Sequence, residues 1–229
     1  MEAARSPARQ LAAAARLVTA LRRLEDRGSN LAANFIRGRR FIAEAHYPAT
    51  DVFDSASGCQ YYFHAHNAHS SNRINAGASE IGHIHVFVRP NGAGIPPIHH
   101  LIAIALDPCG RPCGLFTTNR WVTGEDFLPA PAAISLARRL RLRGTAPASR
   151  VIDALLILYA TEIATLLTAR DAIIAAAQAE LGPHVEAFEH RDLEITSSLP
   201  IDLPARLADL RSLIPETGTD PAMVGTRTV

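Results

Sequence analysis

The chain has 229 residues, of which 48% are hydrophobic, and its formal net charge is +1. This length suits one large domain or a domain with a helical extension, and the balanced charge excludes the strongly basic class of nucleic-acid-binding and anionic-membrane-binding proteins. All 23 basic residues are arginine, so no Schiff-base lysine, P-loop lysine or lysine general base can operate in this protein.

The first 48 residues are predicted to form an N-terminal helical segment. Apolar residues recur at helical spacing over residues 7–27. Ser29 or Asn30 can cap a second helix that reaches about residue 45 and ends before Pro48. Residues 49–58 are predicted to be a loop.

Four short segments rich in aromatic and β-branched residues follow and predict strands. These segments are residues 59–66, 82–89, 99–106 and 114–121. Links rich in glycine and proline separate the last three segments, which favours an antiparallel meander. Residues 192–203 supply a candidate fifth strand.

Helical patterns return after the predicted meander. The predicted helices are residues 132–143, 147–181, with a candidate break near residues 169–171, and 204–213. The fold class is therefore predicted as α+β, with an antiparallel sheet of four to five strands packed by N-terminal and C-terminal helices. Residues 49–213 are predicted to form this core domain, and residues 214–229 are predicted to be a disordered tail.

A cytoplasmic location without a membrane or nucleic-acid partner is expected. No uncharged apolar segment of about twenty residues is present, and the N-terminus lacks the apolar core of a signal peptide. The three cysteines argue against a secreted disulfide scaffold. Two of them, Cys109 and Cys113, bound the stretch CGRPC, which is either a turn with two small residues or a metal or redox pair.

Two His-x-His pairs occupy the first two predicted strands. Because side chains alternate along a strand, His64 and His66 share one face of the first strand, and His83 and His85 share one face of the second. Hairpin pairing is expected to bring His66 near His83 and His64 near His85. Neutral imidazoles that converge in this way are typical metal ligands, so these four histidines are the predicted ligands of a divalent transition metal.

Glu80 precedes the second pair by three residues and is predicted to be a metal ligand or a general base. The donor set suits Fe, Zn or Cu. A hydrogen-bonded polar network without metal and non-metal acid–base catalysis remain alternatives. His69 is expected to be a surface loop residue, and His99 and His100 are placed outside the site. The polar link of residues 67–81 is predicted to be an exposed, mobile lid.

The block TTNRWVTGE contains a second candidate catalytic residue, Arg120. Its guanidinium can bind a carboxylate or a phosphate through two parallel hydrogen bonds, which suits a small-molecule substrate. The alternative is a strand end with outward polar residues. On the long predicted helix, Glu162 and Arg170 lie two turns apart and are expected to form solvated or half-buried ion pairs.

The blocks QYYFHAH, EIGHIHVFVRP, HHLIAIALD and LFTTNRWVTGE resemble a family of uncharacterised bacterial proteins, a domain of unknown function, over residues 41–171. This resemblance implies no activity. The stretch GHIHVFVRP is also similar to the signature of histidine-triad nucleotide hydrolases and transferases. That similarity implies a phosphate-attacking role for His85, but Phe87 stands where the third histidine belongs.

The predicted function is metal binding, most simply in a metal-dependent oxygenase or hydrolase that acts on a small polar molecule. The alternatives are a metal-binding or sensing module without turnover, a histidine-triad-like enzyme, and a structural protein whose histidines satisfy a polar core. The substrate, the metal and the oligomeric state do not follow from the sequence.

Overall fold

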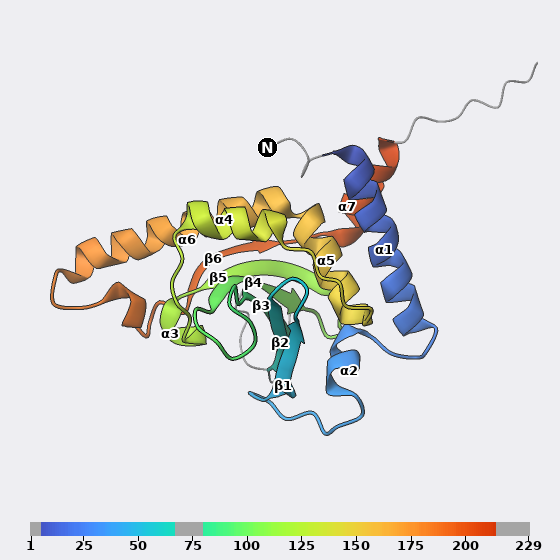
Figure 1. Cartoon of the computed structure of the whole chain (residues 1–229), viewed down its shortest axis with the longest axis horizontal. Coiled ribbons are helices and arrows are strands. Elements are labelled where there is room, and N and C mark those ends of the chain that lie inside the picture. The colour runs from blue at the N-terminus through green and yellow to red at the C-terminus, as the bar shows by residue number, and fades with distance from the viewer. Residues whose placement is uncertain (1–5, 67–79, 214–229) are drawn as a thin grey trace, which may run out of the picture.

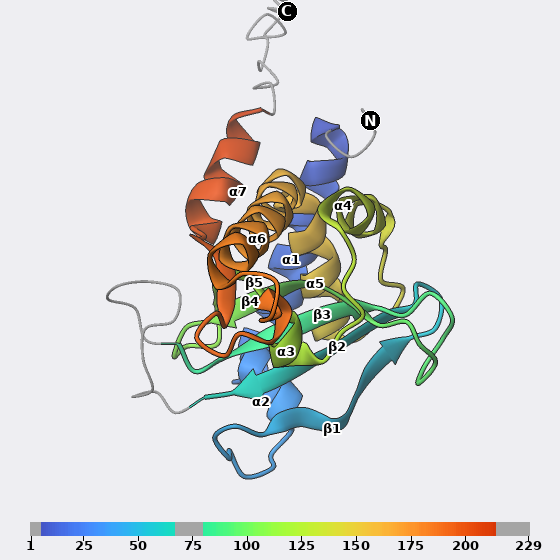
Figure 2. The same cartoon turned by 90° about the vertical axis from the view of Figure 1, so that its left-hand side faces the viewer.

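The computed structural model describes residues 6–66 and 80–213 (Figures 1 and 2). In these residues, six antiparallel strands form one sheet in the sequential order β1 to β6. The strands are β1 (His46–Asp54), β2 (Cys59–Ala65), β3 (Gly82–Val88), β4 (His99–Leu106), β5 (Pro112–Thr118) and β6 (Ile195–Pro200). The helices are α1 (Pro7–Glu25), α2 (Leu31–Ile36), α3 (Arg120–Thr123), α4 (Ala130–Arg139), α5 (Pro147–Leu158), α6 (Ala160–Leu181) and α7 (Leu203–Ser212).

The antiparallel sheet is confirmed, but it has six strands instead of four or five. The candidate fifth strand is present as β6. The additional strand is β1, which lies at one edge of the sheet in a region predicted to be helix and loop. Pro48 is tolerated in β1 because an edge strand pairs with a neighbour on one side only. The backbone N–H that proline lacks is therefore not needed on the other side.

The second helix was predicted to reach residue 45, and this prediction is wrong. Helix α2 ends at Ile36 because Arg37 adopts a left-handed conformation with φ of 51°. The connection that follows is held by the buried Tyr47, whose hydroxyl donates to the Arg40 carbonyl and accepts from the Ile42 amide, at 2.7 and 2.8 Å. A side chain of β1 therefore fixes the irregular backbone that leads into β1.

The helices other than the short α3 gather on one side of the sheet (Figure 2). Helix α6 contacts β5 and β6, α4 contacts β4, and α2 contacts β1 and β2. The strands present Tyr61, Phe63, Ile84, Val86 and Ile104 to this side, where they pack with apolar residues of the helices in one core. The same core includes residues of α1 and α2. The predicted domain boundary at residue 48 stays a prediction.

The long helix predicted over residues 147–181 is divided into α5 and α6. The two helices meet at Tyr159 with a bend of 78°, ten residues before the predicted break. In the described part of the chain, no single helix has the length and apolar character needed to cross a membrane. Helices α5 and α6 taken together reach that length and apolar composition, but the pair is bent.

The second face of the sheet is also largely buried. Its small apolar cluster consists of Ala103, Ala105 and Phe116. Histidine and aromatic side chains of β1, β2, β3 and β4 also lie on this face. The fold thus separates an aliphatic face, which carries the helices, from a histidine-rich face.

Candidate metal centre

The predicted ligands lie on the histidine-rich face of the sheet. His64 of β2 stands opposite His83 of β3, and Tyr62 stands opposite His85. The direct pairing is therefore offset by two residues from His66 with His83 and His64 with His85. The expected proximity is nevertheless confirmed, because the ring centroids of His66 and His83 lie 4.8 Å apart and those of His64 and His85 lie 6.3 Å apart. A shift of two residues leaves every side chain on its face, and His66 still reaches the group because its amide donates to the Ile81 carbonyl at 2.9 Å.

Three of the four predicted ligands form a compact group. His64, His66 and His83 each offer one ring nitrogen, and these three atoms lie within 4.8 Å of one another. His85 joins the group through His83, because their Nε2 atoms are 2.9 Å apart. Bonds of 2.0–2.1 Å to one ion would place such nitrogens about 3–3.5 Å apart, so the cluster needs only small movements to hold a metal.

Each of three imidazoles has its Nδ1 atom engaged by a neighbouring side chain. His83 Nδ1 lies 2.6 Å from Glu80 Oε1, and His66 Nδ1 lies 3.1 Å from Glu44 Oε1. His85 Nδ1 lies 3.1 Å from His100 Nε2. Within the described residues, the buried His66 Nε2 has no hydrogen-bond partner. His66 Nε2 is therefore the ring nitrogen left for a ligand, whereas the Nε2 atoms of His83 and His85 contact each other and His64 Nε2 lies 3.5 Å from Glu44 Oε2.

The electrostatic environment keeps the imidazoles of His64 and His85 neutral at pH 7. Burial, together with the neighbouring His83, His66 and His46, lowers the pKa of His64 to about 4. Burial and the neighbouring His83 and His100 hold the pKa of His85 well below its ordinary value. Neutral imidazoles have free lone pairs, which is the state that a metal requires.

Glu44, His46 and His100 belong to the centre but were not predicted to do so. Glu44 fell in the wrongly extended second helix. The ring of His46 stacks on Tyr62 at a centroid distance of 4.1 Å and meets His64 edge-on at 5.1 Å. The miss of His46 follows from the missed strand β1, since a strand at residue 46 would have shown a third neighbour of the histidine pairs, whereas Glu44 lies in the connection before that strand.

His100 was placed outside the site for two reasons. His99 and His100 point to alternate faces of their strand, and a regular meander puts both at the far end of the sheet from His66 and His83. The register between β3 and β4 shifts after the Val86–Ile102 pair, so that Phe87 pairs with His100. Leu101 and Ile102 consequently both enter the core on the helix side, and His100 moves to the histidine-rich face. No signal in the sequence marks this shift.

A family model described as "Domain of unknown function (DUF6969)" matches residues 11–201, a span that runs from within α1 to just past β6. The chain belongs to this family. The match confirms the expected relation to a family of uncharacterised domains and extends it beyond residues 41–171. No curated protein and no solved structure matches the chain.

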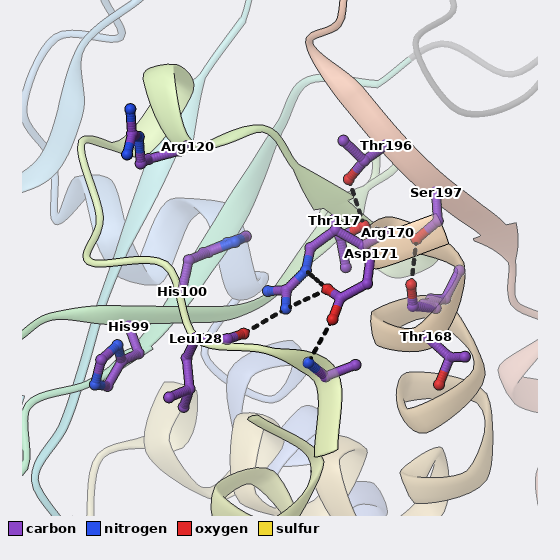
Figure 3. A network of polar contacts seen from close by, with 12 residues as sticks. His99, His100, Thr117, Arg120, Leu128, Thr168, Arg170, Asp171, Thr196 and Ser197 are labelled. Atoms are coloured by element: carbon purple, nitrogen blue, oxygen red, sulfur yellow. Dashed lines mark hydrogen bonds and ion pairs between the residues drawn. The ribbon is translucent and has the colours of Figure 1, made fainter. Parts of the chain in front are cut away.

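Arg120 lies on the short helix α3, and its guanidinium forms ion pairs with Glu186 and Glu189, at 2.9 and 2.8 Å. It also lies over the ring of Phe188, 4.9 Å from the centroid. Figure 3 shows its side chain directed away from His100. These contacts give Arg120 a role in joining α3 to the segment after α6, and its predicted catalytic role stays a prediction.

Arg170 occupies the interior between α6 and the segment before α4 (Figure 3). The side chain is 1% exposed, pairs with Asp171 at 2.8 Å and donates to the Leu128 carbonyl at 2.5 Å. The expected ion pairs are formed with other partners, since Glu162 pairs with Arg206 and Arg170 with Asp171. Burial and the charge of Arg170 lower the pKa of His100 to about 3.

Two further predicted features fall on residues that the structure does not describe. His69 and most of the predicted lid lie in residues 67–79, and the predicted tail lies in residues 214–229. Both predictions stay predictions.

Proposed function

We propose that this protein binds one divalent transition-metal ion through Nε2 atoms of His66 and His83, together with His64, and that His85 stands beside this set as the candidate fourth nitrogen donor. The observation that carries the proposal is the engagement of Nδ1 in three neighbouring imidazoles by Glu44, Glu80 and His100.

The contacts at Nδ1 resemble those around metal-ligating histidines in general. A carboxylate that accepts the Nδ1 proton fixes the tautomer, orients the ring and raises the basicity of Nε2. Glu80 serves His83 in this way, and Glu44 serves His66. A buried ring nitrogen without a partner is costly, so the Nε2 of His66, which has no hydrogen-bond partner among residues 6–66 and 80–213, further supports a bound ion.

The donor set determines the class of metal. Three or four neutral nitrogens suit Zn, Cu or Fe and are poor ligands for Mg or Ca, which prefer oxygen. Glu44 and Glu80 stand beside the cluster and offset part of the charge of a divalent ion. The metal identity within this class remains open to measurement.

A metal-dependent oxygenase or hydrolase acting on a small polar molecule is the more specific form of this proposal. Three ligating histidines leave a coordination position for water or substrate, and His64, His66 and His83 form such a set. The 2.6 Å contact with His83 supports an orienting role for Glu80 rather than that of a general base. Ligation by His85 would close the site and favour a binding or sensing module.

The histidine-triad alternative receives less support. A phosphate-attacking histidine needs a free ring nitrogen that substrate can reach. His85 is 2% exposed, and both of its ring nitrogens face other histidines. Phe87, which replaces the third histidine of the signature, packs between Tyr62 and His100.

The test is metal content per chain, measured by elemental analysis after purification without a polyhistidine tag and after reconstitution with Zn, Fe(II) or Cu(II). We expect about one ion per chain and an affinity that is lost in His66→Ala and His83→Ala. His184→Ala is the matched control, because His184 is exposed and follows α6, outside the histidine-rich face. Stoichiometric metal in a His66→Ala, His83→Ala double variant would contradict the proposal.

Turnover requires a separate measurement. Oxygen consumption and ester or phosphoester hydrolysis, each with and without the bound metal, distinguish the enzyme from the sensing module. His85→Ala distinguishes an open site with three histidine ligands from a closed site with four. The open site keeps its metal in this variant, whereas the closed site loses affinity for it.

A further inference from the structure

A cavity of about 640 Å³ lies on the side of the molecule that carries α1 and α7. Its walls come from the C-terminal half of α1, the start of α7 and the turn between β4 and β5. Helices α1 and α7 contact each other, as Figure 1 shows at one end of the molecule. The volume falls within the range of cavities that hold small ligands.

The floor of this cavity is aliphatic and its rim is charged. Leu24, Leu31 and Leu203 are buried in the floor. The rim carries three carboxylates, from Glu25, Asp107 and Asp202, and one guanidinium, from Arg111. The lining side chains therefore carry an excess of negative charge where the cavity meets solvent.

Local hydrogen bonds hold the walls in place without a ligand. Asp107 Oδ1 accepts from the amides of Cys109 and Arg111, both at 2.8 Å. Asp202 Oδ1 accepts from the Ala205 amide at 2.9 Å at the start of α7. Gly110 has a φ of 72°, and a Cβ there would lie 2.5 Å from the Asn30 side chain, so the turn packs directly on the start of α2.

The hydrogen bonds at the rim leave acceptor atoms for a ligand. Asp107 and Asp202 use only Oδ1 in the contacts above, and in the part of the chain that the structure describes no hydrogen bond reaches the Oδ2 atom of either. These two atoms and the exposed Glu25 carboxylate can accept from an ammonium group, whose protons form charge-assisted hydrogen bonds.

We propose that this cavity binds a cationic amphiphile, a molecule with an aliphatic body of about the length of an octyl chain and a protonated amine at one end. The body lies on the leucine floor, where it loses contact with water. The ammonium group lies at the rim among the three carboxylates. The site contains none of the histidines proposed as metal ligands and does not depend on a bound metal.

Matched probes test the chemistry of the site at pH 7.5. Octylammonium, octanol and octanoate share one chain length and differ only in the charge of the head group. We expect calorimetric titration of the full-length protein to give affinities in that order, with octylammonium at least about tenfold tighter than octanoate, equivalent to about 1.4 kcal/mol. Equal or tighter binding of octanoate would overturn the proposal.

The native cysteines locate the bound probe. Cys109 is exposed at the rim, whereas burial raises the pKa of Cys113 to about 11 and that of Cys59 further. Iodoacetamide should therefore modify Cys109 first, and octylammonium should slow this reaction in a saturable way with the same midpoint as the calorimetric titration. Unchanged alkylation at saturating octylammonium would contradict binding in this cavity.

Two variants complete the test. Leu207→Trp places a large side chain into the cavity and should abolish binding of octylammonium and octanol alike. Glu25→Gln removes one exposed rim charge without touching the core and should weaken octylammonium while leaving octanol unchanged. Glu180→Gln, an exposed substitution on α6, is the matched control for loss of charge. Wild-type affinity for octylammonium in Glu25→Gln and Leu207→Trp would refute the site.

Discussion

The two carboxylates at the candidate centre differ strongly in their access to water. The side chain of Glu80 is 7% exposed and that of Glu44 is 58% exposed, although each contacts a histidine Nδ1 atom. Solvent screens an exposed contact, and side-chain entropy opposes it, whereas a buried contact keeps its strength. Glu80 is therefore expected to hold His83 more firmly than Glu44 holds His66.

Glu80→Gln should lower the affinity for metal by about 10- to 100-fold, the usual effect of losing a carboxylate that orients a ligating histidine. The glutamine keeps the volume of the side chain but removes the charge that polarises the His83 ring. Competition with a chromophoric chelator measures this change, and Glu44→Gln provides the comparison, with a smaller expected loss. Equal losses in the two variants would show that burial does not decide the strength of these contacts.

Glu125 illustrates a buried carboxyl group that is not a predicted ligand. It is 5% exposed, and its Oε2 atom accepts from the His100 amide at 2.6 Å. Burial raises its pKa from 4.5 to about 7, against the opposing effects of that hydrogen bond and of Arg170. The folded protein therefore binds a proton at Glu125 more tightly than the unfolded chain does.

This difference makes the stability of the protein depend on pH. The contribution of protonated Glu125 to the free energy of unfolding is fully present below about pH 4.5 and is lost as the pH rises through about 7. Relative to Glu125→Gln, the wild-type protein should lose about 3 kcal/mol of unfolding free energy over this window, at 1.36 kcal/mol per pKa unit. Urea denaturation of both proteins at the two ends of the window measures it, and parallel stability profiles would contradict the expectation.

At the scale of elements, the centre depends on how β2 and β3 begin and end. Gly82 opens β3 directly before His83, with a φ of 147°. A Cβ at this position would lie 2.2 Å from the His64 carbonyl oxygen and 2.7 Å from the ring of Phe63. Only glycine allows the two strands to approach closely enough to bring His64 opposite His83.

Gly82→Ala should lower the unfolding free energy by about 3 kcal/mol, because the methyl group adds a clash with the neighbouring strand to the strain of its backbone conformation. Gly94→Ala is the control: Gly94 also has a positive φ, but a Cβ there meets nothing within 4 Å, so only about 1 kcal/mol is expected. Thermal unfolding compares the two. Similar costs for both variants would mean that β2 moves to accommodate the methyl group.

The strands that the sequence predicted well are those with regular alternation and clear turns. β4 begins and ends at the predicted residues, and the shared faces of β2 and β3 follow from alternation alone. β1 could not be predicted, because Pro48 and the left-handed Asp51 interrupt its pattern, and its register with β2 shifts between Tyr47 and Val52.

The contacts of the centre were harder to predict than its principal histidines. Glu44 reaches the cluster through an irregular connection whose shape depends on Tyr47. His100 reaches it through a register shift between β3 and β4 that depends on packing across the whole sheet. Local patterns in the sequence encode which face a residue occupies, but these two arrangements arise from tertiary packing.

For the whole molecule, a metal at this centre would join separate parts of the chain. The ligands and their neighbours come from the connection before β1 and from β2, β3 and β4. An ion that binds the folded state alone stabilises it by an amount that grows with the ratio of free metal to the dissociation constant. The stabilisation should therefore appear in global unfolding and not only near the site.

At a free metal concentration of about 1,000 times the dissociation constant, the expected gain is about 4.1 kcal/mol. For a chain of this size, the melting temperature should then rise by about 8–16 °C. Differential scanning calorimetry with and without metal measures the rise, and EDTA should reverse it. A similar rise in His66→Ala would locate the metal elsewhere, whereas His184→Ala should behave as wild type.

The most direct test of the metal centre is X-ray absorption spectroscopy of the zinc-loaded protein. The account predicts a first shell that contains three or four nitrogens at about 2.0–2.1 Å, together with the outer-shell scattering of imidazole rings. A first shell of oxygen alone, or one with sulfur at about 2.3 Å, would contradict it, because neither donor set can arise from His64, His66, His83 and His85.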